Sequence, residues 1–82
     1  MIEHISRSAI TFIHKGRKII IKGELFLDPP GDWNGGCFEV PSSLIKKWES
    51  GDAVTDDERS EILRALTEEI QEKRQLKKIE VV

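Results

Sequence analysis

Cysteine is nearly absent from this sequence, which contains only Cys37. A single cysteine cannot form an internal disulfide, and no CxxC pair or His/Cys cluster with zinc-binding spacing occurs. The sequence therefore excludes a disulfide-stapled scaffold and a zinc-finger-like site. A reducing compartment fits this composition, so we expect a cytoplasmic protein.

Long hydrophobic runs are also missing, since no apolar run is longer than three residues, as in Ile19-Ile20-Ile21. A membrane-spanning helix needs roughly 20 apolar residues. A secretion signal needs a basic segment followed by an apolar one. We expect neither a membrane partner nor a leader segment.

Positive charge is not in excess, because 13 Lys and Arg accompany 15 Asp and Glu, for a formal net charge of −2. Nucleic-acid binding that is driven by the overall charge of a protein requires many Lys and Arg residues to neutralise phosphates. The charge balance argues against that class and leaves a basic protein partner open.

Hydrophobic residues make up 38% of the chain, which predicts one folded domain over residues 1–82. A domain of this size buries only roughly 60% of its unfolded surface, which leaves little core for a deep pocket. We predict an α+β fold with a small, mostly antiparallel sheet, mainly within residues 2–40. Helices over about 42–49 and 56–74 would pack on one face, and residues 79–82 would form a strand or a disordered tail.

β-Branched residues dominate two runs, Ile10–Ile13 and Arg17–Lys22, which are separated by a turn containing Gly16. This pattern predicts a β-hairpin. After Gly23 the chain either extends this strand or bends into another one. Cys37–Val40 predicts a later strand.

A short helix is predicted to follow Pro41, which suits a first helical turn. Leu44, Ile45 and Trp48 then recur at a spacing that would bury all three on one helical face. This interpretation makes Trp48 a core anchor.

The last third of the chain is acidic, with nine Asp and Glu but only two Arg between Glu49 and Glu72. Thr55 followed by Glu58 matches a capping box, so a helix should begin here. Its buried stripe is predicted to consist of Ile62, Leu63, Leu66 and Ile70, with help from the stems of Arg59 and Lys73.

No catalytic, metal or cofactor site is predicted. A nucleophilic Cys37 would need a nearby base, and the only histidines, His4 and His14, lie in or beside predicted strands. We interpret Cys37 as a small buried hydrophobe. The acidic segment lacks calcium-loop spacing, and capping explains its first carboxylates.

The basic hairpin tip, Lys15-Gly16-Arg17-Lys18, could contact phosphate. No interleaved aromatic side chains supply a stacking platform, so a solvated turn is the preferred interpretation. Trp33 lies in a loop of turn-forming residues. It either forms an interface hot spot or folds back over the core, and the sequence leaves both open.

The order of these segments resembles the small immunity-protein families of bacterial polymorphic-toxin and contact-dependent-inhibition systems, in particular the Immunity protein 74 family. The resemblance rests on the hairpin Ile10–Lys22 running into Gly23-Glu24, on Phe38-Glu39-Val40, on Trp48-Glu49, and on Asp56-Asp57-Glu58-Arg59 before Ile62-Leu63. It implies a stoichiometric inhibitor without catalysis. Such proteins bind a toxin's C-terminal domain, often a nuclease, and block its active site or substrate access.

Two segments are our candidates for the toxin interface. One is the loop that carries Trp33, and the other is the acidic segment before and at the start of the last helix. The candidate residues are Asp28, Asp32, Trp33, Asn34, Asp52, Asp56, Asp57 and Glu61. Since Asp56 and Asp57 also serve the helix start, Glu61 is the position that sequence favours for testing an acidic interface.

Two alternatives to the toxin inhibitor remain. One is a nucleic-acid-binding regulatory module that uses the Lys15–Lys22 hairpin. The other is a structural homodimer subunit that pairs through Ile79–Val82. We expect a monomer or a weak homodimer.

Overall fold

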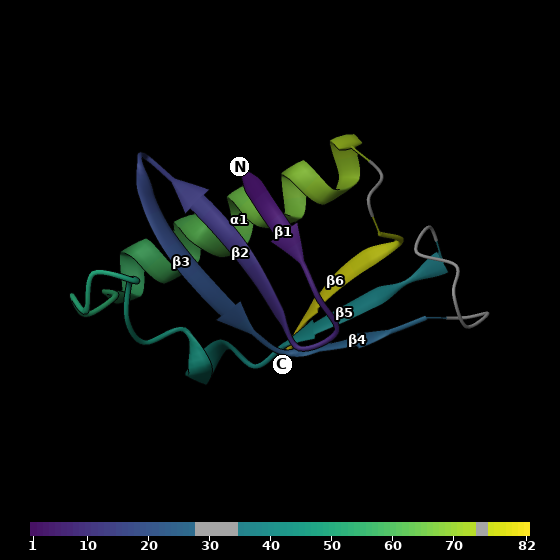
Figure 1. Cartoon of the computed structure of the whole chain (residues 1–82), viewed down its shortest axis with the longest axis horizontal. Helices are drawn as coiled ribbons and strands as arrows, with labels where there is room; N and C mark the ends of the chain where they lie inside the picture. The colour runs from purple at the N-terminus through teal and green to yellow at the C-terminus, as the bar shows by residue number, and fades with distance from the viewer. Residues whose placement is uncertain (28–34, 74–75) are drawn as a thin grey trace.

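The computed structural model describes residues 1–27, 35–73 and 76–82, and Figure 1 shows how its elements are arranged. In chain order these elements are β1 (Ile2–Ile5), β2 (Ala9–His14), β3 (Arg17–Lys22), β4 (Glu24–Phe26), β5 (Cys37–Val40), the 3₁₀ helix η2 (Ser42–Leu44), α1 (Asp56–Lys73) and β6 (Lys78–Val81). The α+β class is confirmed.

The first sheet is antiparallel, with the strand order β1-β2-β3. The β2–β3 hairpin turns at Lys15 and Gly16, whose φ angles are 53° and 79°. Positive φ at both central residues is typical of a type I′ turn, whose twist matches that of the paired strands. This geometry fixes the register, with Phe12 opposite Ile19 on the core side.

The second sheet has the order β4-β5-β6, and its β5–β6 pair is parallel. We expected one mostly antiparallel sheet, whereas the strands divide into two. Gly23 lies where the chain leaves β3, and a side chain there would clash with the backbone carbonyl of Glu39. The close approach that glycine permits starts the second sheet. The parallel pair needs a long crossover, which α1 provides.

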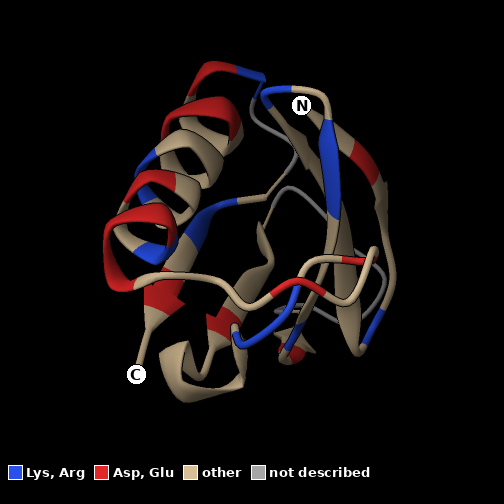
Figure 2. Cartoon of the chain, turned by 90° about the vertical axis from the view of Figure 1, so that its left-hand side faces the viewer, with Lys and Arg blue, Asp and Glu red and all other residues tan. Residues whose placement is uncertain are grey.

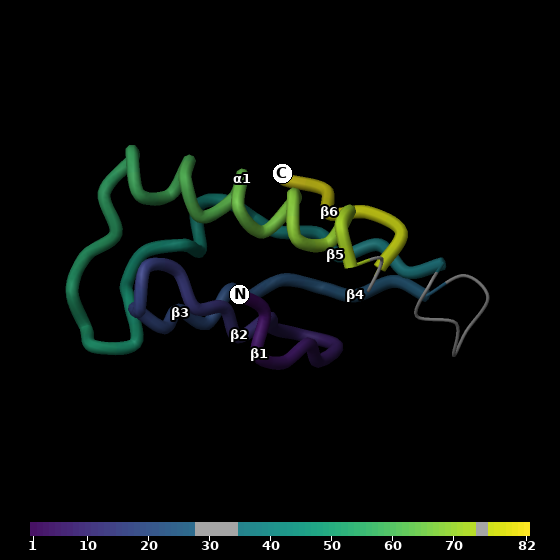
Figure 3. The backbone as a smooth tube through the Cα atoms, turned by 90° about the horizontal axis from the view of Figure 1, so that it is seen from above, coloured from purple at the N-terminus to yellow at the C-terminus, as the bar shows by residue number. Residues whose placement is uncertain are grey.

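α1 lies along one side of the first sheet, as Figures 1 and 3 show from two directions. Ile62, Leu66 and Ile70 are buried, as their periodicity predicted, and Leu63 is partly buried. The rest of the buried cluster comes from both sheets and from the segment before α1: Ile10, Phe12, Ile19, Ile21, Phe38, Val40, Ile45, Trp48, Val54 and Leu76. One continuous core therefore joins α1 to both sheets.

The predicted short helix over residues 42–49 is wrong. Only Ser42–Leu44 is helical, as the single-turn η2, and Leu44 is 46% exposed rather than buried. The next residues instead make non-helical backbone bonds. The Glu49 N–H donates to Lys18 O of β3 (2.9 Å), a long-range contact, and the Trp48 N–H donates locally to Asp52 O (2.9 Å). A helix of eight residues is marginal by itself, so pairing with β3 outcompetes it.

Candidate functional site

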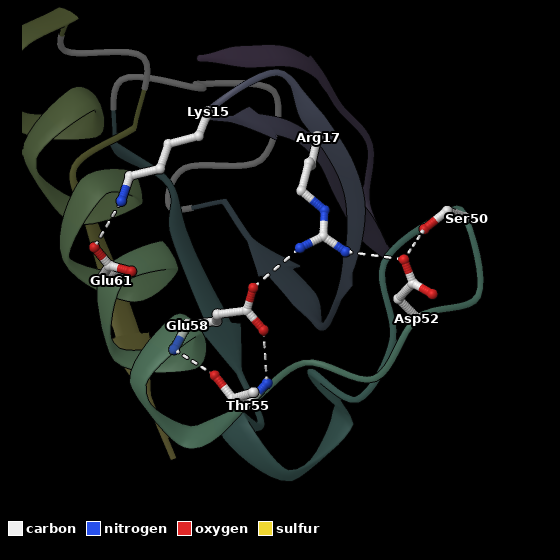
Figure 4. Close-up of polar contacts among 7 residues, drawn as sticks. All are labelled: Lys15, Arg17, Ser50, Asp52, Thr55, Glu58 and Glu61. Atoms are coloured by element: carbon white, nitrogen blue, oxygen red, sulfur yellow. Dashed lines mark hydrogen bonds and ion pairs between the residues drawn. The ribbon is translucent and has the colours of Figure 1, made fainter.

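The helix α1 begins with the predicted capping box, drawn in Figure 4. The Thr55 N–H donates to Glu58 Oε1 (2.9 Å), and the Glu58 N–H donates to Thr55 Oγ1 (3.1 Å). The bond from the Thr55 backbone lowers the pKa of the Glu58 carboxyl, and the nearby Arg17 charge acts in the same direction. The box thereby fixes a charged carboxylate at the first turn of α1.

The basic hairpin tip folds directly onto this acidic segment (Figure 4). Lys15 Nζ lies 3.1 Å from Glu61 Oε1, while the Arg17 guanidinium reaches Glu58 (3.1 Å) and Asp52 (3.2 Å) with different nitrogens. The Lys15–Glu61 pair is exposed and stabilises the fold by at most about 1 kcal/mol. The main consequence of these pairs is electrostatic. Lys15 and Arg17 offset acidic charge that the sequence analysis had placed on an unpaired surface.

Arg17 also covers the indole of Trp48, with its guanidinium carbon 4.2 Å from the ring centroid. Trp48 is only 4% exposed, so its predicted role as a core anchor is confirmed even though the helix predicted to carry it is absent. A guanidinium at this distance from an indole makes a cation–π contact. Arg17 thus ties β3, the Trp48 segment and the start of α1 together.

The outer face of α1 keeps a set of carboxylates that form no ion pair within the described residues, although the exposed Arg64 lies on the same face. Asp57, Glu68 and Glu72 are all exposed, and none of them forms an ion pair in that part of the chain. At about 100° per residue these positions fall within roughly 60° of one another around the helix. Figure 2 shows acidic residues on successive turns of α1.

The sequence candidates occupy different environments. Asp52 and Glu61 are paired with Arg17 and Lys15, and Asp56 is paired with Arg59 at 2.6 Å. Asp57 is exposed in the first turn of α1. The remaining candidates lie outside the described residues: Asp28, Asp32, Trp33 and Asn34.

Glu61, which sequence favoured as the test position, is a poor choice. Charge reversal there would also repel Lys15, so it would mix a fold effect with a binding effect. Glu68 and Glu72 are cleaner positions. Sequence reasoning predicted the capping role of Glu58 but missed its ion pair with Arg17, although the opposite charges of the hairpin tip and the α1 start were a readable signal.

Comparison with known protein families finds a matching family model. The family model of Immunity protein 74 matches residues 2–81. The chain belongs to the Immunity protein 74 family. No curated protein and no solved structure matches it.

In this Immunity protein 74 family member, the cations of the hairpin tip are engaged within the chain. Besides Lys15 and Arg17, Lys18 pairs with Glu3 at 3.1 Å, and this hydrogen bond raises the pKa of Lys18. Phosphate binding by the tip would have to displace these carboxylates. The geometry therefore favours the solvated, self-paired turn over a nucleic-acid contact.

Cys37 of this family member is partly buried in β5, where its Sγ lies 3.8 Å from Glu80 Oε2. Burial raises the pKa of the Cys37 thiol, and the carboxylate of Glu80 acts in the same direction. Both effects disfavour the thiolate that a nucleophile needs. Across residues 1–27, 35–73 and 76–82, no group of three or more His, Cys, Asp or Glu could hold a metal ion.

No helix of the described chain is long and apolar enough to cross a membrane.

Proposed function

We propose that this protein is an immunity protein that binds a cognate bacterial toxin domain stoichiometrically and blocks its active site or its access to substrate. It would act without catalysis, within a contact-dependent inhibition or polymorphic toxin system. The family match over residues 2–81 supports the immunity class. The more specific part of the proposal is which surface of this protein contacts the toxin.

The outer face of α1 is the observation that carries this proposal. Asp57, Glu68 and Glu72 present three exposed carboxylates that are free of ion pairs among the described residues. A toxin that acts on nucleic acid must attract phosphate, so its active-site surface is expected to be basic. An acidic helix face would speed the encounter with such a surface and would favour the correct orientation.

The remaining proposed contacts fall into two groups. Asp28, Asp32, Trp33 and Asn34 would supply a loop contact. The carboxylates of Asp52, Asp56 and Glu61 would contribute only as members of internal pairs, because each already faces a cation of this chain. Binding through them would have to share or break those pairs.

Co-purification is the primary test of the immunity function. The tagged protein is co-expressed with the neighbouring open reading frames, and the material that co-purifies is identified by mass spectrometry. We expect one stoichiometric partner that kills cells when expressed alone. Recovery of nucleic acid, or of this chain alone, would remove the toxin-inhibitor reading.

Charge variants on α1 then test the surface. The double variant Glu68→Lys/Glu72→Lys should lower the association rate with the toxin domain by about tenfold at low salt and flatten its salt dependence. Arg64→Glu changes the charge of the same face in the opposite direction, so it should speed association. An unselective structural disturbance would slow association in both variants. Unchanged rates in both would remove α1 from the interface.

A further inference from the structure

β3 is an edge strand of the first sheet, and the hairpin geometry determines which of its backbone groups face outward. His14 and Arg17 flank the two-residue turn directly, so they exchange hydrogen bonds. Hydrogen-bonded and non-hydrogen-bonded pairs alternate along an antiparallel ladder. Ile19 and Ile21 therefore also bond to β2. The positions between and beside them, Lys18, Ile20 and Lys22, direct their N–H and C=O groups away from β2.

Three backbone bonds support this assignment. Ile13, the residue opposite Lys18, directs its N–H away from β3, to Met1 O at 2.7 Å. The Gly23 N–H returns toward the β2 side and bonds Ser8 O at 3.0 Å. On the outer side, Lys18 O accepts the Glu49 N–H at 2.9 Å. The chain itself therefore pairs with the first outward-facing position of this edge.

The next two outward positions, Ile20 and Lys22, have no backbone partner on that side in the part of the chain that the structure describes. A groove with a volume of about 520 Å³ lies beside them. Its far wall is formed by Leu44, Lys46 and Lys47. A second hollow of about 370 Å³ shares Lys22 and Leu44 with the first, and continues it past the end of β3.

The groove combines apolar and basic groups. Ile20 is 47% exposed and Leu44 is 46% exposed, which makes them two of the most exposed large hydrophobic side chains among the described residues. Lys22, Lys46 and Lys47 form no ion pair within residues 1–27, 35–73 and 76–82. Glu49 is the acid of the first hollow, and it lies at the end that the chain already closes. Glu24 and Glu39 line the second hollow, so the excess of lysine is confined to the first one.

We propose that this groove receives an extended acidic segment of the bound partner, which adds to the β3 edge as a fourth strand. The free N–H and C=O groups of Ile20 and Lys22 would pair with its backbone. Its carboxylates would face Lys22, Lys46 and Lys47, while one of its apolar side chains would cover Ile20. Assignment of this segment to a toxin domain rests on the function proposed above.

Charge complementarity selects this occupant over a second copy of the chain. Two β3 edges that paired antiparallel about Ile20 would place Lys22 of one copy opposite Lys18 of the other, whose outward carbonyl is already bonded to the Glu49 N–H. The pair of Lys18 with Glu3 would only partly offset the repulsion between the two lysines. Like charges directly opposite each other in neighbouring strands are destabilising, and lysines on an edge strand are a common defence against self-pairing. An acidic strand meets no such repulsion.

Amide hydrogen exchange by NMR, on the isotope-labelled full chain, tests the proposal with a defined probe. The probe is a blocked, extended peptide that carries both valine and glutamate on one face of the strand, and the control peptide carries lysine in place of each glutamate. At about 1 mM the acidic peptide should slow exchange at Ile20 and Lys22 by at least about tenfold, while the lysine peptide should not. The amides of Ile19 and Ile21 serve as internal references because β2 already protects them.

A matched pair of variants checks the charge contribution. Lys47→Glu should weaken binding of the acidic peptide by about threefold to tenfold at low salt. Lys77→Glu makes the same change of charge outside the groove and should leave the affinity unchanged. Equal effects in the two variants would show that only net charge matters, and would overturn the proposed site.

Three other outcomes would also overturn it. They are unchanged exchange at Ile20 and Lys22 with the acidic peptide, equal protection by the lysine peptide, and protection that rises with protein concentration when no peptide is present. The last outcome would identify a second copy as the occupant.

The toxin domain, measured separately, distinguishes this proposal from the proposed function. If the toxin domain binds without protecting Ile20 and Lys22, the groove is not its docking site but the immunity function stands. If the toxin domain does not bind while the acidic peptide does, the immunity function fails and the strand-binding edge stands.

Discussion

Replacing Trp48 with alanine should remove a large part of the stability of this protein. The indole is 4% exposed within the core cluster, and the Arg17 guanidinium covers its ring at 4.2 Å. Truncation of a buried Trp to Ala costs about 3 to 5 kcal/mol. The total stability of a chain of this length is roughly 4 to 12 kcal/mol, so the variant should lie close to the folding limit.

The loss should be visible in both thermal and urea unfolding. For a chain of this size each kcal/mol lowers Tm by about 4 to 8 °C, so a decrease of roughly 12 to 40 °C is expected. Far-UV circular dichroism is the suitable signal because it is independent of tryptophan fluorescence. An unchanged m-value in urea would show that the variant alters stability rather than the extent of unfolding.

A double-mutant cycle isolates the contact between Trp48 and Arg17. Arg17→Met keeps much of the aliphatic stem but removes the charge, together with its pairs to Glu58 and Asp52. The coupling between the two positions should be about 0.5 to 1 kcal/mol, the range expected for a partly exposed cation–π contact. A loss below about 2 kcal/mol for Trp48→Ala would refute the core-anchor reasoning.

Four further predictions use the same unfolding assay or the toxin complex. Gly23→Ala should destabilise the fold by about 1 to 3 kcal/mol in urea, because its new methyl group would meet the backbone of Glu39. Thr55→Ala should cost about 1 kcal/mol through loss of the α1 cap. The Glu58 carboxyl has a pKa lowered from its ordinary 4.5, so its contribution is complete above that pH and is lost as the pH falls through the lowered value. Glu58→Gln should therefore flatten the acid side of the stability profile. Trp33→Ala should weaken toxin binding with little change in Tm, and destabilisation equal to that of Trp48→Ala would remove Trp33 from the interface.

Local features of the fold could be predicted well from sequence. The capping box at Thr55 and the spacing of Ile62, Leu66 and Ile70 lie within one helix, so the signal and the structure share the same short range. The β2–β3 hairpin is equally local, because its turn residues fix its register. These elements need little information from the rest of the chain.

The segment after Pro41 shows where this reasoning stops. Ile45 and Trp48 are buried as predicted, but a three-residue spacing of apolar side chains fits an irregular segment as well as a helix. The backbone bond from Glu49 to Lys18 decides between the two, and it joins residues far apart in sequence. The division into two sheets depends on a similar long-range contact, the close approach of Gly23 to Glu39.

The candidate site was predicted in part for the same reason. A count of charges locates the acidic segment, but it does not show that Lys15 and Arg17 lie against Glu61, Glu58 and Asp52. These pairs connect the β-hairpin to α1 and to the segment before it, across more than thirty positions of sequence. The hydrogen-bonding edge of β3 was not predicted, because outward and inward positions are defined only once the hairpin register is known.

Internal pairing changes what a partner would experience at this surface. At physiological ionic strength the screening length is about 8 Å, so a carboxylate beside its own cation acts on an approaching protein as a weak dipole. The sequence charge of the acidic segment therefore overstates its attraction, and the unpaired Asp57, Glu68 and Glu72 of α1 should dominate steering. The β3 groove has the opposite character, since among the described residues its three unpaired lysines outnumber its one carboxylate, Glu49. A partner that used both surfaces would need a basic face and an acidic strand, and this two-sign requirement would discriminate against toxins that carry only one of them.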